Sequence, residues 1–424
     1  MQLESSQSIR TAILSATCAV LGAGAVQADG GKSETSLLVY SENDRINARA
    51  IAYKWSKVQK NESIFGFGLT YDAMTGASPT GAAPSLYPQT VTGSSGSLRT
   101  EVPANTIPAN DRFKERRLGL HANYSHPVTP LANLLASVNL SSERDYTSLG
   151  ISGGIAQGFD QGRTVLEFHG GFSRDLSKPP GGNPYPLTVV IIAGESNDEI
   201  PVQADQQKLV YDALFSLSRE LGSRTIVRGS YALNYASGYL NDPYKVVSLV
   251  RSPDSTDPGE PVSDIYEQRP ATRMKHALFV QLKTDISGSI LDLSARGFQD
   301  DWGVQSLTGD LYYRVKIGKT AAIEPHLRGY FQTAANFYKP FLIDGQPYDS
   351  YVSADSRLAD FVSVTYGLTY SVAVSERSRL SVTGEAYRQM GDNNPEEAFG
   401  NLRQLDLFPE LKAIMLRVGL EHSF

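Results

Sequence analysis

Apolar and polar residues alternate along the last stretch of the chain, which reads "IMLRVGLEHSF". From Ile414 to Phe424 every second position carries an apolar side chain or His422, and mostly polar residues or glycine stand between them. A period of two residues is that of a β-strand with one apolar and one polar face. The pattern recurs in "SIFGFGLTYD", "RLGLHANYS", "SLTGDLYYRVKI" and "FVSVTYGLTYSV". The sequence therefore predicts an all-β chain.

Residues 1–28 are typical of a cleaved Sec signal peptide. Arg10 precedes the apolar stretch "TAILSATCAVLGAGAV", and small residues at Val26 and Ala28 predict cleavage after residue 28. The only cysteine, Cys18, lies inside this segment. The mature chain is therefore expected to have no disulfide, no catalytic thiol and no cysteine-bound metal. We expect residues 29–424 to form one domain.

Beyond this segment no apolar run is long enough to cross a bilayer as a helix, which takes about 18 residues or more. The other structure that can span a membrane is a closed β-barrel, because it leaves no backbone amide unpaired. About sixteen alternating segments of roughly 9–14 residues have the length of tilted membrane-spanning strands. A soluble β-sandwich also alternates and is the competing interpretation, but its two sheets do not need so many such segments. The predicted strands are 35–42, 46–57, 62–72, 114–125, 132–142, 145–157, 163–174, 206–219, 224–236, 272–284, 289–299, 303–317, 320–334, 357–374, 378–389 and 411–424.

The connections between these segments alternate in length. Short ones such as "KNES", "FDQG" and "ISGS" follow the even-numbered strands, whereas every long one follows an odd-numbered strand. The long connections are 73–113, 175–205, 237–271, 335–356 and 390–410. Outer-membrane barrels have short periplasmic turns and long extracellular loops. We therefore predict an antiparallel transmembrane β-barrel of about sixteen strands in the bacterial outer membrane, with both termini in the periplasm.

The C-terminal residues suggest the partners of such a barrel. Outer-membrane barrels commonly end on an aromatic residue that follows alternating apolar positions, so Leu420, His422 and Phe424 are interpreted as the signal read by the outer-membrane assembly machinery. The alternative is a soluble strand that ends in phenylalanine. Outer-membrane lipid is the other expected partner. The net charge of −6 and the lack of basic clusters with interleaved aromatics exclude a nucleic-acid partner.

Charged residues occupy many inward positions in the second half of the predicted barrel. A ring of mixed charge could line an aqueous channel and bias its ion selectivity. The alternative, which we favour, is cross-strand ion pairs that stiffen the wall. Both can hold, since sixteen strands leave a lumen wider than side chains can fill. The inward charged residues and one histidine are Arg228, Asp292, Arg296, Asp310, Arg314, Glu324, His326, Arg328, Glu385, Arg417 and Glu421.

Evidence for catalysis is sparse. His121 and His169 are expected on inward positions with Glu167 beside His169, while His126 lies in a turn and His422 faces lipid. No local signature of a serine hydrolase is present, and six histidines without paired spacing do not indicate a metal site. We predict no catalytic residue, no metal and no cofactor.

The long loops contain the most unusual stretches. "YDAMTGASPTGAAP" (71–84) is rich in small residues, so it forms either a mobile external loop or a segment folded into the barrel mouth. In the loop over 237–271, opposite charges could pair and close the loop on itself, the alternative being a solvated loop. These charged residues are Asp242, Lys245, Glu267, Arg269 and Arg273.

The stretches "LLVYSENDRIN", "LTYDAMTGASPTGA", "SSERDYTS", "GYLNDPYK" and "YEQRPATR" resemble an uncharacterised bacterial family, domain of unknown function 3570. The resemblance covers nearly the whole mature chain and implies an outer-membrane barrel of Gram-negative bacteria. It brings no known ligand or catalytic residue. Its expected genetic neighbours are a small lipoprotein, a thioredoxin-like protein and a periplasmic flavin transferase, which implies a possible envelope redox system.

Three functions follow as hypotheses. The first is a channel or binding barrel for a small solute, with the loops 71–84 and 237–271 shaping its mouth. The second is a non-conducting barrel that holds partners such as a small envelope lipoprotein. The third is an outer-membrane barrel enzyme.

Overall fold

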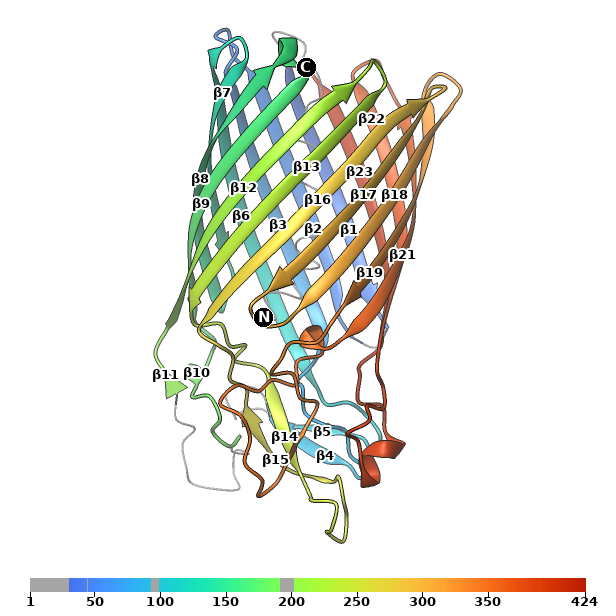
Figure 1. The fold of residues 1–424 in the computed structure, drawn as a ribbon. Helices are drawn as coiled ribbons and strands as arrows, with labels where there is room; N and C mark the ends of the chain where they lie inside the picture. Colours follow the sequence, from blue (N-terminus) through green and yellow to red (C-terminus); the bar gives the residue numbers. More distant parts are fainter. Residues whose placement is uncertain (1–29, 44, 93–98, 191–201) are drawn as a thin grey trace.

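Sixteen strands close into one antiparallel barrel in the computed structural model, which describes residues 30–43, 45–92, 99–190 and 202–424 (Figure 1). The first strand pairs with the second and with the last, which closes the ring. The predicted all-β barrel is thereby confirmed, including its first strand. No helix in the described ranges is long and apolar enough to cross a membrane. Around the ring the strands are β1 (Gly31–Glu42), β2 (Asn47–Val58), β3 (Ile64–Pro79), β6 (Ala109–Thr129), β7 (Ala132–Ser142), β8 (Tyr146–Phe159), β9 (Thr164–Ser177), β12 (Gln206–Leu221), β13 (Thr225–Gly238), β16 (Thr272–Ile286), β17 (Ser289–Asp300), β18 (Gln305–Ile317), β19 (Ala321–Gln332), β21 (Phe361–Ala373), β22 (Ser378–Gly391) and β23 (Leu411–Ser423).

The predicted boundaries are wrong mainly at one hairpin. β3 continues to Pro79 and β6 begins at Ala109, so these strands pair well beyond the predicted ends at 72 and 114. Their pairing shifts register between Gly76 and Ser78. This extended part of the hairpin contacts other loops, so it has no alternating apolar face. The alternation of apolar and polar residues therefore ends before the strand ends.

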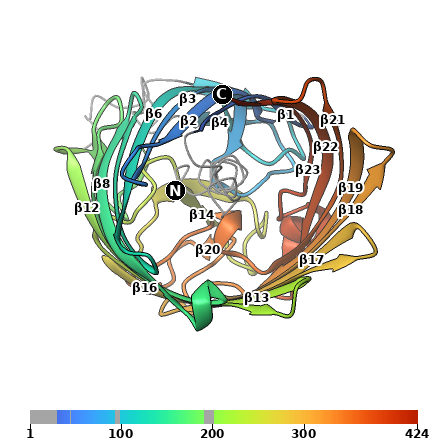
Figure 2. The same cartoon turned by 90° about the horizontal axis from the view of Figure 1, so that it is seen from above.

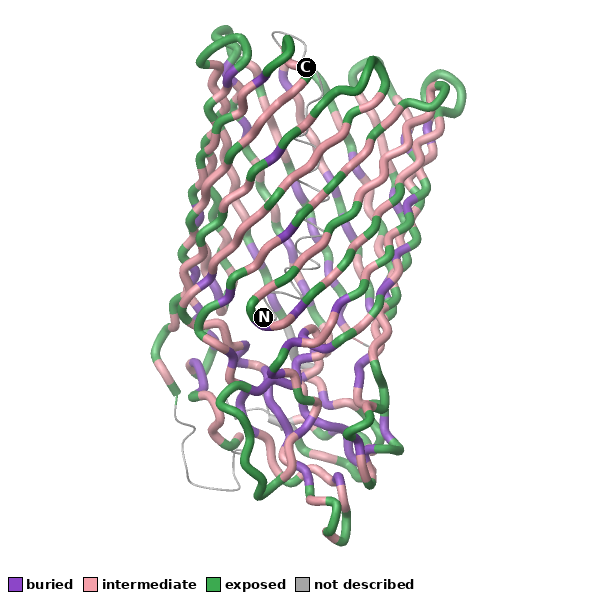
Figure 3. Tube along the Cα trace, viewed as in Figure 1, coloured by how far each residue is buried: buried purple, intermediate pink, exposed green. Residues whose placement is uncertain are grey.

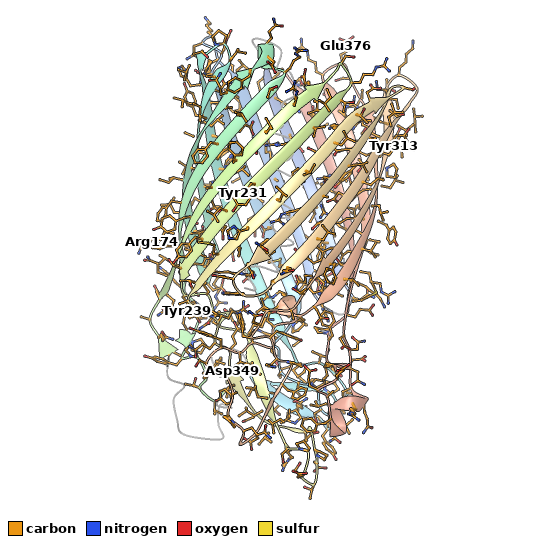
Figure 4. All side chains as sticks on the ribbon, in the orientation of Figure 1. Arg174, Tyr231, Tyr239, Tyr313, Asp349 and Glu376 are labelled. Carbon is orange, nitrogen blue, oxygen red and sulfur yellow. The ribbon has the colours of Figure 1, made fainter. Side chains whose placement is uncertain are left out.

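Large apolar side chains are exposed at alternate positions around the outside of the barrel. A soluble protein hides such residues, whereas a lipid-facing wall presents them. Tyr231 and Tyr313 lie on this outer wall (Figure 4). The exposed apolar residues include Leu37, Val39, Ile51, Phe215, Leu278, Val280, Leu307, Tyr366, Leu368 and Leu416. The molecule is an outer-membrane-type barrel.

The two ends of the barrel differ. At one end, the turn end, the strands are joined by tight connections, and Glu376 lies on one of them (Figure 4). At the opposite end, the loop end, five long loops gather into a folded body that we call the cap (Figure 1). The described residues of the cap are 80–92, 99–108, 178–190, 202–205, 239–271, 333–360 and 392–410.

The cap has secondary structure of its own. β14 (Val246–Val250) pairs with β15 (Pro261–Tyr266) and, in parallel, with β20 (Leu342–Ile343). A view along the barrel shows β14 and β20 within the outline of the ring (Figure 2). The cap therefore lies across the mouth of the lumen. Its smaller elements are β4 (Gln89–Thr92), β5 (Arg99–Val102), β10 (Asn183–Pro184), β11 (Val202–Gln203), η2 (Ser356–Leu358) and η3 (Gly400–Gln404), and η1 (Asp160–Gly162) lies in a tight turn.

Much of the apolar core lies in the cap, where many of the buried segments are found (Figure 3). One cluster joins β14 and β15 to the β19–β21 loop, and another joins four loops through Ala83, Val250, Phe341 and Leu402. Such clusters link loops that are distant in sequence, so they hold the cap as one body. The residues of the first cluster are Val247, Ile265, Val352 and Ala354.

Candidate functional site

A chamber lies along the lumen wall. A cavity of about 630 Å³ is lined by residues of β7, β8, β9, β12, β13, β16 and β17. A second cavity of about 330 Å³ lies where the wall meets the cap, with Tyr239 and Trp302 among its lining. Both cavities include Ser148, Ser173 and Asn234, so they adjoin. Together they lead from the middle of the lumen to the underside of the cap.

The chamber exists because small residues occupy the inward positions of β8 and β9. Since successive side chains of a strand point to opposite faces, the exposed Leu149 and Ile151 place their even-numbered neighbours inward. Those neighbours include Gly150 and Ser152, which face Ser173 and Gly171 across the strand pair. Because these inward side chains are small, they leave free volume in the lumen beside the wall. The serines present their hydroxyl groups to this volume.

The charged residues that the sequence placed inward lie on β13, β17, β18, β19, β22 and β23, so some of them are on strands that also line the chamber. Most of them meet a partner of opposite charge. Arg228 pairs with Glu167 at 2.9 Å, Arg314 with Glu324 at 3.8 Å, and Arg328 with Asp310 at 2.7 Å. Asp292 accepts a hydrogen bond from Gln281 at 2.8 Å and lies 3.7 Å from Lys283, Glu421 pairs with Lys32, and Arg417 lies 3.5 Å from the Thr383 hydroxyl.

His326 lies between two carboxylates in this wall. Its Nε2 is 3.0 Å from Asp310 Oδ1 and its Nδ1 is 3.0 Å from Glu385 Oε1. An imidazolium donates to both carboxylates, whereas a neutral ring donates to only one of them. The ring stacks on Tyr312 with 4.0 Å between centroids. Gly367 permits this arrangement, because a Cβ there would lie 3.1 Å from both Glu385 and His326.

Replacing Glu385 by alanine is expected to lower the free energy of unfolding by about 1–3 kcal/mol, because it leaves the buried Nδ1 of His326 without its hydrogen-bond partner. The measurement is guanidinium unfolding of the protein in lipid vesicles, followed by tryptophan fluorescence. Glu421→Ala is the matched control, because its ion pair with Lys32 is exposed and such pairs contribute at most about 1 kcal/mol. Equal losses in the two variants would contradict the expectation.

Six charged residues form a buried network in the cap. Arg269 contacts Glu267 at 2.7 Å and Asp355 at 2.8 Å, and Arg357 contacts Asp242 at 2.8 Å. Arg357 also pairs with Asp355, and the sixth member is the buried Lys245, whose ammonium donates to the Pro79 carbonyl. Three cations thus stand against three carboxylates. The network joins the β13–β16 loop to the β19–β21 loop.

The charges of the network depend on one another. Burial alone would raise the pKa of Asp355, but Arg357, Lys245 and Arg269 hold this pKa well below its usual range. The pKa of Arg269 is raised, because Glu267, Asp355 and Asp242 outweigh the effect of its burial. All three carboxylates are almost inaccessible to solvent. Removing one cation would leave a buried carboxylate without full compensation.

The sequence analysis named four members of this network, Asp242, Lys245, Glu267 and Arg269, as possible partners. It did not name Asp355 and Arg357, which belong to another loop. Arg273, the fifth predicted partner, lies apart from the network: it pairs with Asp300 at the end of β17 and lies over the Trp302 ring at 4.2 Å.

The small-residue stretch "TGASPTGA" ends β3 with its first five residues and enters the cap at Thr80. Thr80 accepts a backbone hydrogen bond from Val246 at 3.0 Å, and the Ala83 N–H donates to the Ser248 hydroxyl at 2.8 Å. Gly81 has φ of 95°, and a Cβ there would lie 2.5 Å from the Val246 carbonyl oxygen. Glycine is therefore required where this segment passes β14.

The histidines considered for catalysis are dispersed. Glu167 pairs with Arg228 rather than with His169, and no hydrogen bond joins His169 to a serine or carboxylate within the described residues. His121 contacts Asn139 at 2.6 Å. His126 and His422 do contact serines, Ser63 at 2.8 Å and Ser378 at 3.0 Å.

Acidic residues gather at one place near the rim. Glu115, Glu143 and Asp145 have oxygen atoms within 4.8 Å of one another. Asp145 accepts a hydrogen bond from the Tyr244 hydroxyl at 2.9 Å, which ties the group to the cap. The sequence analysis did not single out these residues.

The C-terminal residues lie at the seam between the first and last strands. Leu420 and Phe424 are exposed on the outer face, as is His422. Phe424 and Gly31 exchange two backbone hydrogen bonds of 2.9 and 2.8 Å. The Phe424 ring lies over Gly31, since a Cβ there would meet it at 2.1 Å. The last residue thus completes the barrel wall.

Comparisons with known proteins identify a sequence family and several solved barrels of low similarity. A sequence model of the family described as "Protein of unknown function (DUF3570)" matches residues 10–422, and a comparison with curated proteins found no match. Similar solved structures include a mutant ferric enterobactin receptor (PfeA) from Pseudomonas aeruginosa, with TM-score 0.45, 10% identity and coverage of 93% of this chain and 60% of that one. CdiB from Acinetobacter baumannii has TM-score 0.46, 8% identity and coverage of 95% and 61%. The CymD monoaromatic hydrocarbon channel has TM-score 0.40, 9% identity and coverage of 94% and 89%. The chain spans about 60% of the receptor, and the similarity concerns the barrel fold alone.

Proposed function

The chain belongs to the DUF3570 family of proteins of unknown function, and we propose that it is an integral barrel of the bacterial outer membrane whose lumen binds a small polar solute and lets it pass. The chamber on the lumen wall is the observation that carries this proposal. Its cavity of about 630 Å³ has the size of a small-molecule site. The hydroxyl and amide groups of Asn139, Ser152, Ser173 and Asn234 line it.

The difference between the two ends of the barrel supports one orientation of the protein in the outer membrane. Short turns of outer-membrane barrels face the periplasm and long loops face outward. In that orientation the cap covers the external mouth, and the second cavity, of about 330 Å³, lies directly beneath it. A solute entering from outside would pass the cap before it reaches the chamber.

Passage is tested with the mature protein, residues 29–424, folded in detergent and checked by heat-shifted gel mobility. Planar-bilayer recordings are expected to show discrete current steps, because the chamber is lined by polar groups. Proteoliposomes are expected to swell in sorbitol, an uncharged polar solute small enough for the chamber. If protein that is verified as folded shows no current steps and no swelling, passage of the solute is ruled out.

A second candidate function is a non-conducting barrel that presents its cap to an envelope protein such as a small lipoprotein. The cap favours this candidate because it exposes aromatic side chains, and aromatic residues are enriched in protein interfaces. The residues are Tyr87, Tyr185, Tyr348 and Tyr351. Co-purification of a lipoprotein that is lost when these tyrosines are changed to serine, with no conductance, would favour this function over passage.

A further inference from the structure

Arg296 differs from the other charged residues of the lumen wall. Its cross-strand neighbours are Phe279 and Thr308, so no carboxylate stands opposite it. Arg328, by contrast, lies directly opposite Asp310 in the register. Within the described residues Arg296 makes no ion pair and no hydrogen bond. It is therefore a lumen guanidinium whose donors are not used by the protein.

The position of Arg296 makes those donors available to a solute. The residue is exposed and lines the 630 Å³ cavity. Its guanidinium carbon lies 5.6 Å from the centroid of the Phe298 ring. A guanidinium beside an aromatic face keeps its planar fork free for a carboxylate, which it can bind through two parallel hydrogen bonds.

The charges around the chamber favour an anion. Its lining contains two permanent cations, Arg296 and Lys275, and one carboxylate, Asp212. Asp212 already accepts a hydrogen bond of 2.7 Å from the Asn234 amide. Lys275 stands opposite Asp300 across the strand pair, so the preference for an anion depends on Arg296.

The remainder of the lining favours a hydroxylated molecule. Asn139, Ser148, Ser152 and Ser173 provide donors and acceptors, and the glycines between them keep the wall flat enough for close approach. A ligand held by these groups would need several hydroxyl groups in addition to its anionic end. Asn139, Ser148 and Ser152 each already have one protein partner, His121, Asp175 and Ser137 respectively, and the further hydrogen-bonding capacity of these groups would go unused with a purely apolar acid.

We infer that the chamber binds a small polyhydroxylated carboxylate, with Arg296 as the residue that binds its carboxylate group. This inference rests on the proposed function and names the class of its solute. The serine and asparagine side chains hydrogen-bond to the hydroxyl groups, and Phe298 covers one side of the anion site.

The test is isothermal titration calorimetry of the full mature protein, folded in detergent micelles, with sodium gluconate as the probe. Gluconate is expected to bind the wild-type protein more tightly than sorbitol, which has hydroxyl groups but no charge. Arg296→Gln is expected to weaken gluconate binding by about tenfold, because it removes a charge-assisted hydrogen-bonding partner, and to leave sorbitol binding unchanged.

Arg174→Gln is the matched control, because Arg174 projects from the outer wall (Figure 4) and its loss changes the net charge equally. Unchanged gluconate affinity in Arg296→Gln, or no gluconate binding by the wild-type protein, would overturn the inference. The two proposals fail separately. Conductance or swelling without gluconate binding leaves passage and removes this site, whereas gluconate binding with neither conductance nor swelling leaves the site and removes passage.

Discussion

Replacing Arg269 by methionine is expected to destabilise the cap by about 3–5 kcal/mol, since removal of one partner from a buried ion-pair network leaves uncompensated charge. Arg269 is fully buried and contacts both Glu267 and Asp355. Lys245 and Arg357 would remain, but neither can replace the 2.7 Å contact with Glu267 without moving its own loop. Methionine keeps much of the side-chain volume, so the loss is electrostatic rather than a cavity effect.

The measurement is the rate of thermolysin cleavage within the cap of the folded protein in detergent. Cleavage is expected to be far faster in Arg269→Met than in the wild type. The barrel should keep its heat-shifted gel mobility, because backbone hydrogen bonds between the strands hold it closed without the cap. Arg388→Met is the matched control: its pair with Glu410 has a side chain 53% exposed, and such pairs contribute at most about 1 kcal/mol. Equal cleavage rates in the two variants would show that the network does not hold the cap.

The barrel could be predicted from the sequence because its outer face meets lipid along every strand. Lipid favours an apolar residue at each outward position, and this preference produces the local alternation of apolar and polar residues. β7 has the predicted limits, 132–142. The prediction failed at the extension of β3 to Pro79 because this extension lies against loops, with Ala77 hydrogen-bonded to Arg45 and Pro79 to Lys245, so the strands stay paired there without an alternating apolar face.

The cap was not predicted as a folded body, and the reason lies in its contacts. Its core is assembled from loops distant in sequence, for example Val247 with Val352. Contacts between distant loops produce no periodic pattern of apolar residues in the sequence. A weaker signal was present: the apolar run "VVSLV" and the pair Leu342–Ile343 are too apolar for solvated loops, and both became strands of the cap sheet.

The candidate site was partly accessible to sequence reasoning. Inward charges follow from strand parity, but whether a charge has a partner depends on register, which sets Arg328 opposite Asp310 and Arg296 opposite Thr308. Sequence alone did not supply that register. The small inward residues that open the chamber were also missed, although Gly150, Ser152 and Ser173 stand at alternate positions where the outward neighbours are large.

Changing Phe424 to serine is expected to reduce the folded protein in the outer membrane to a small fraction of its normal amount in cells. The physical reason is recognition rather than stability. We propose that Leu420, His422 and Phe424 form the strand end that the assembly machinery binds before the barrel closes. At that stage β23 is not yet paired with β1, so the edge that later contacts Gly31 is free to pair with a partner strand.

In the finished barrel the same substitution is expected to cost about 1–3 kcal/mol, because it removes lipid-facing apolar surface, whereas the backbone hydrogen bonds to Gly31 do not depend on side-chain identity. Purified Phe424→Ser protein should therefore refold in detergent as well as the wild type. The measurement is the amount of heat-shifted protein in isolated outer membranes, compared with refolding yield in detergent.

Phe331→Ser is the matched control for this experiment. Phe331 on β19 is 49% exposed and Phe424 is 47% exposed, so both substitutions remove the same apolar surface from the lipid-facing wall. Only the terminal position should impair assembly in cells, and Phe424→Tyr should restore it, because an aromatic ring is kept at the end of the strand. A similar loss in Phe331→Ser would mean that lost lipid contact, rather than a terminal recognition signal, accounts for the effect.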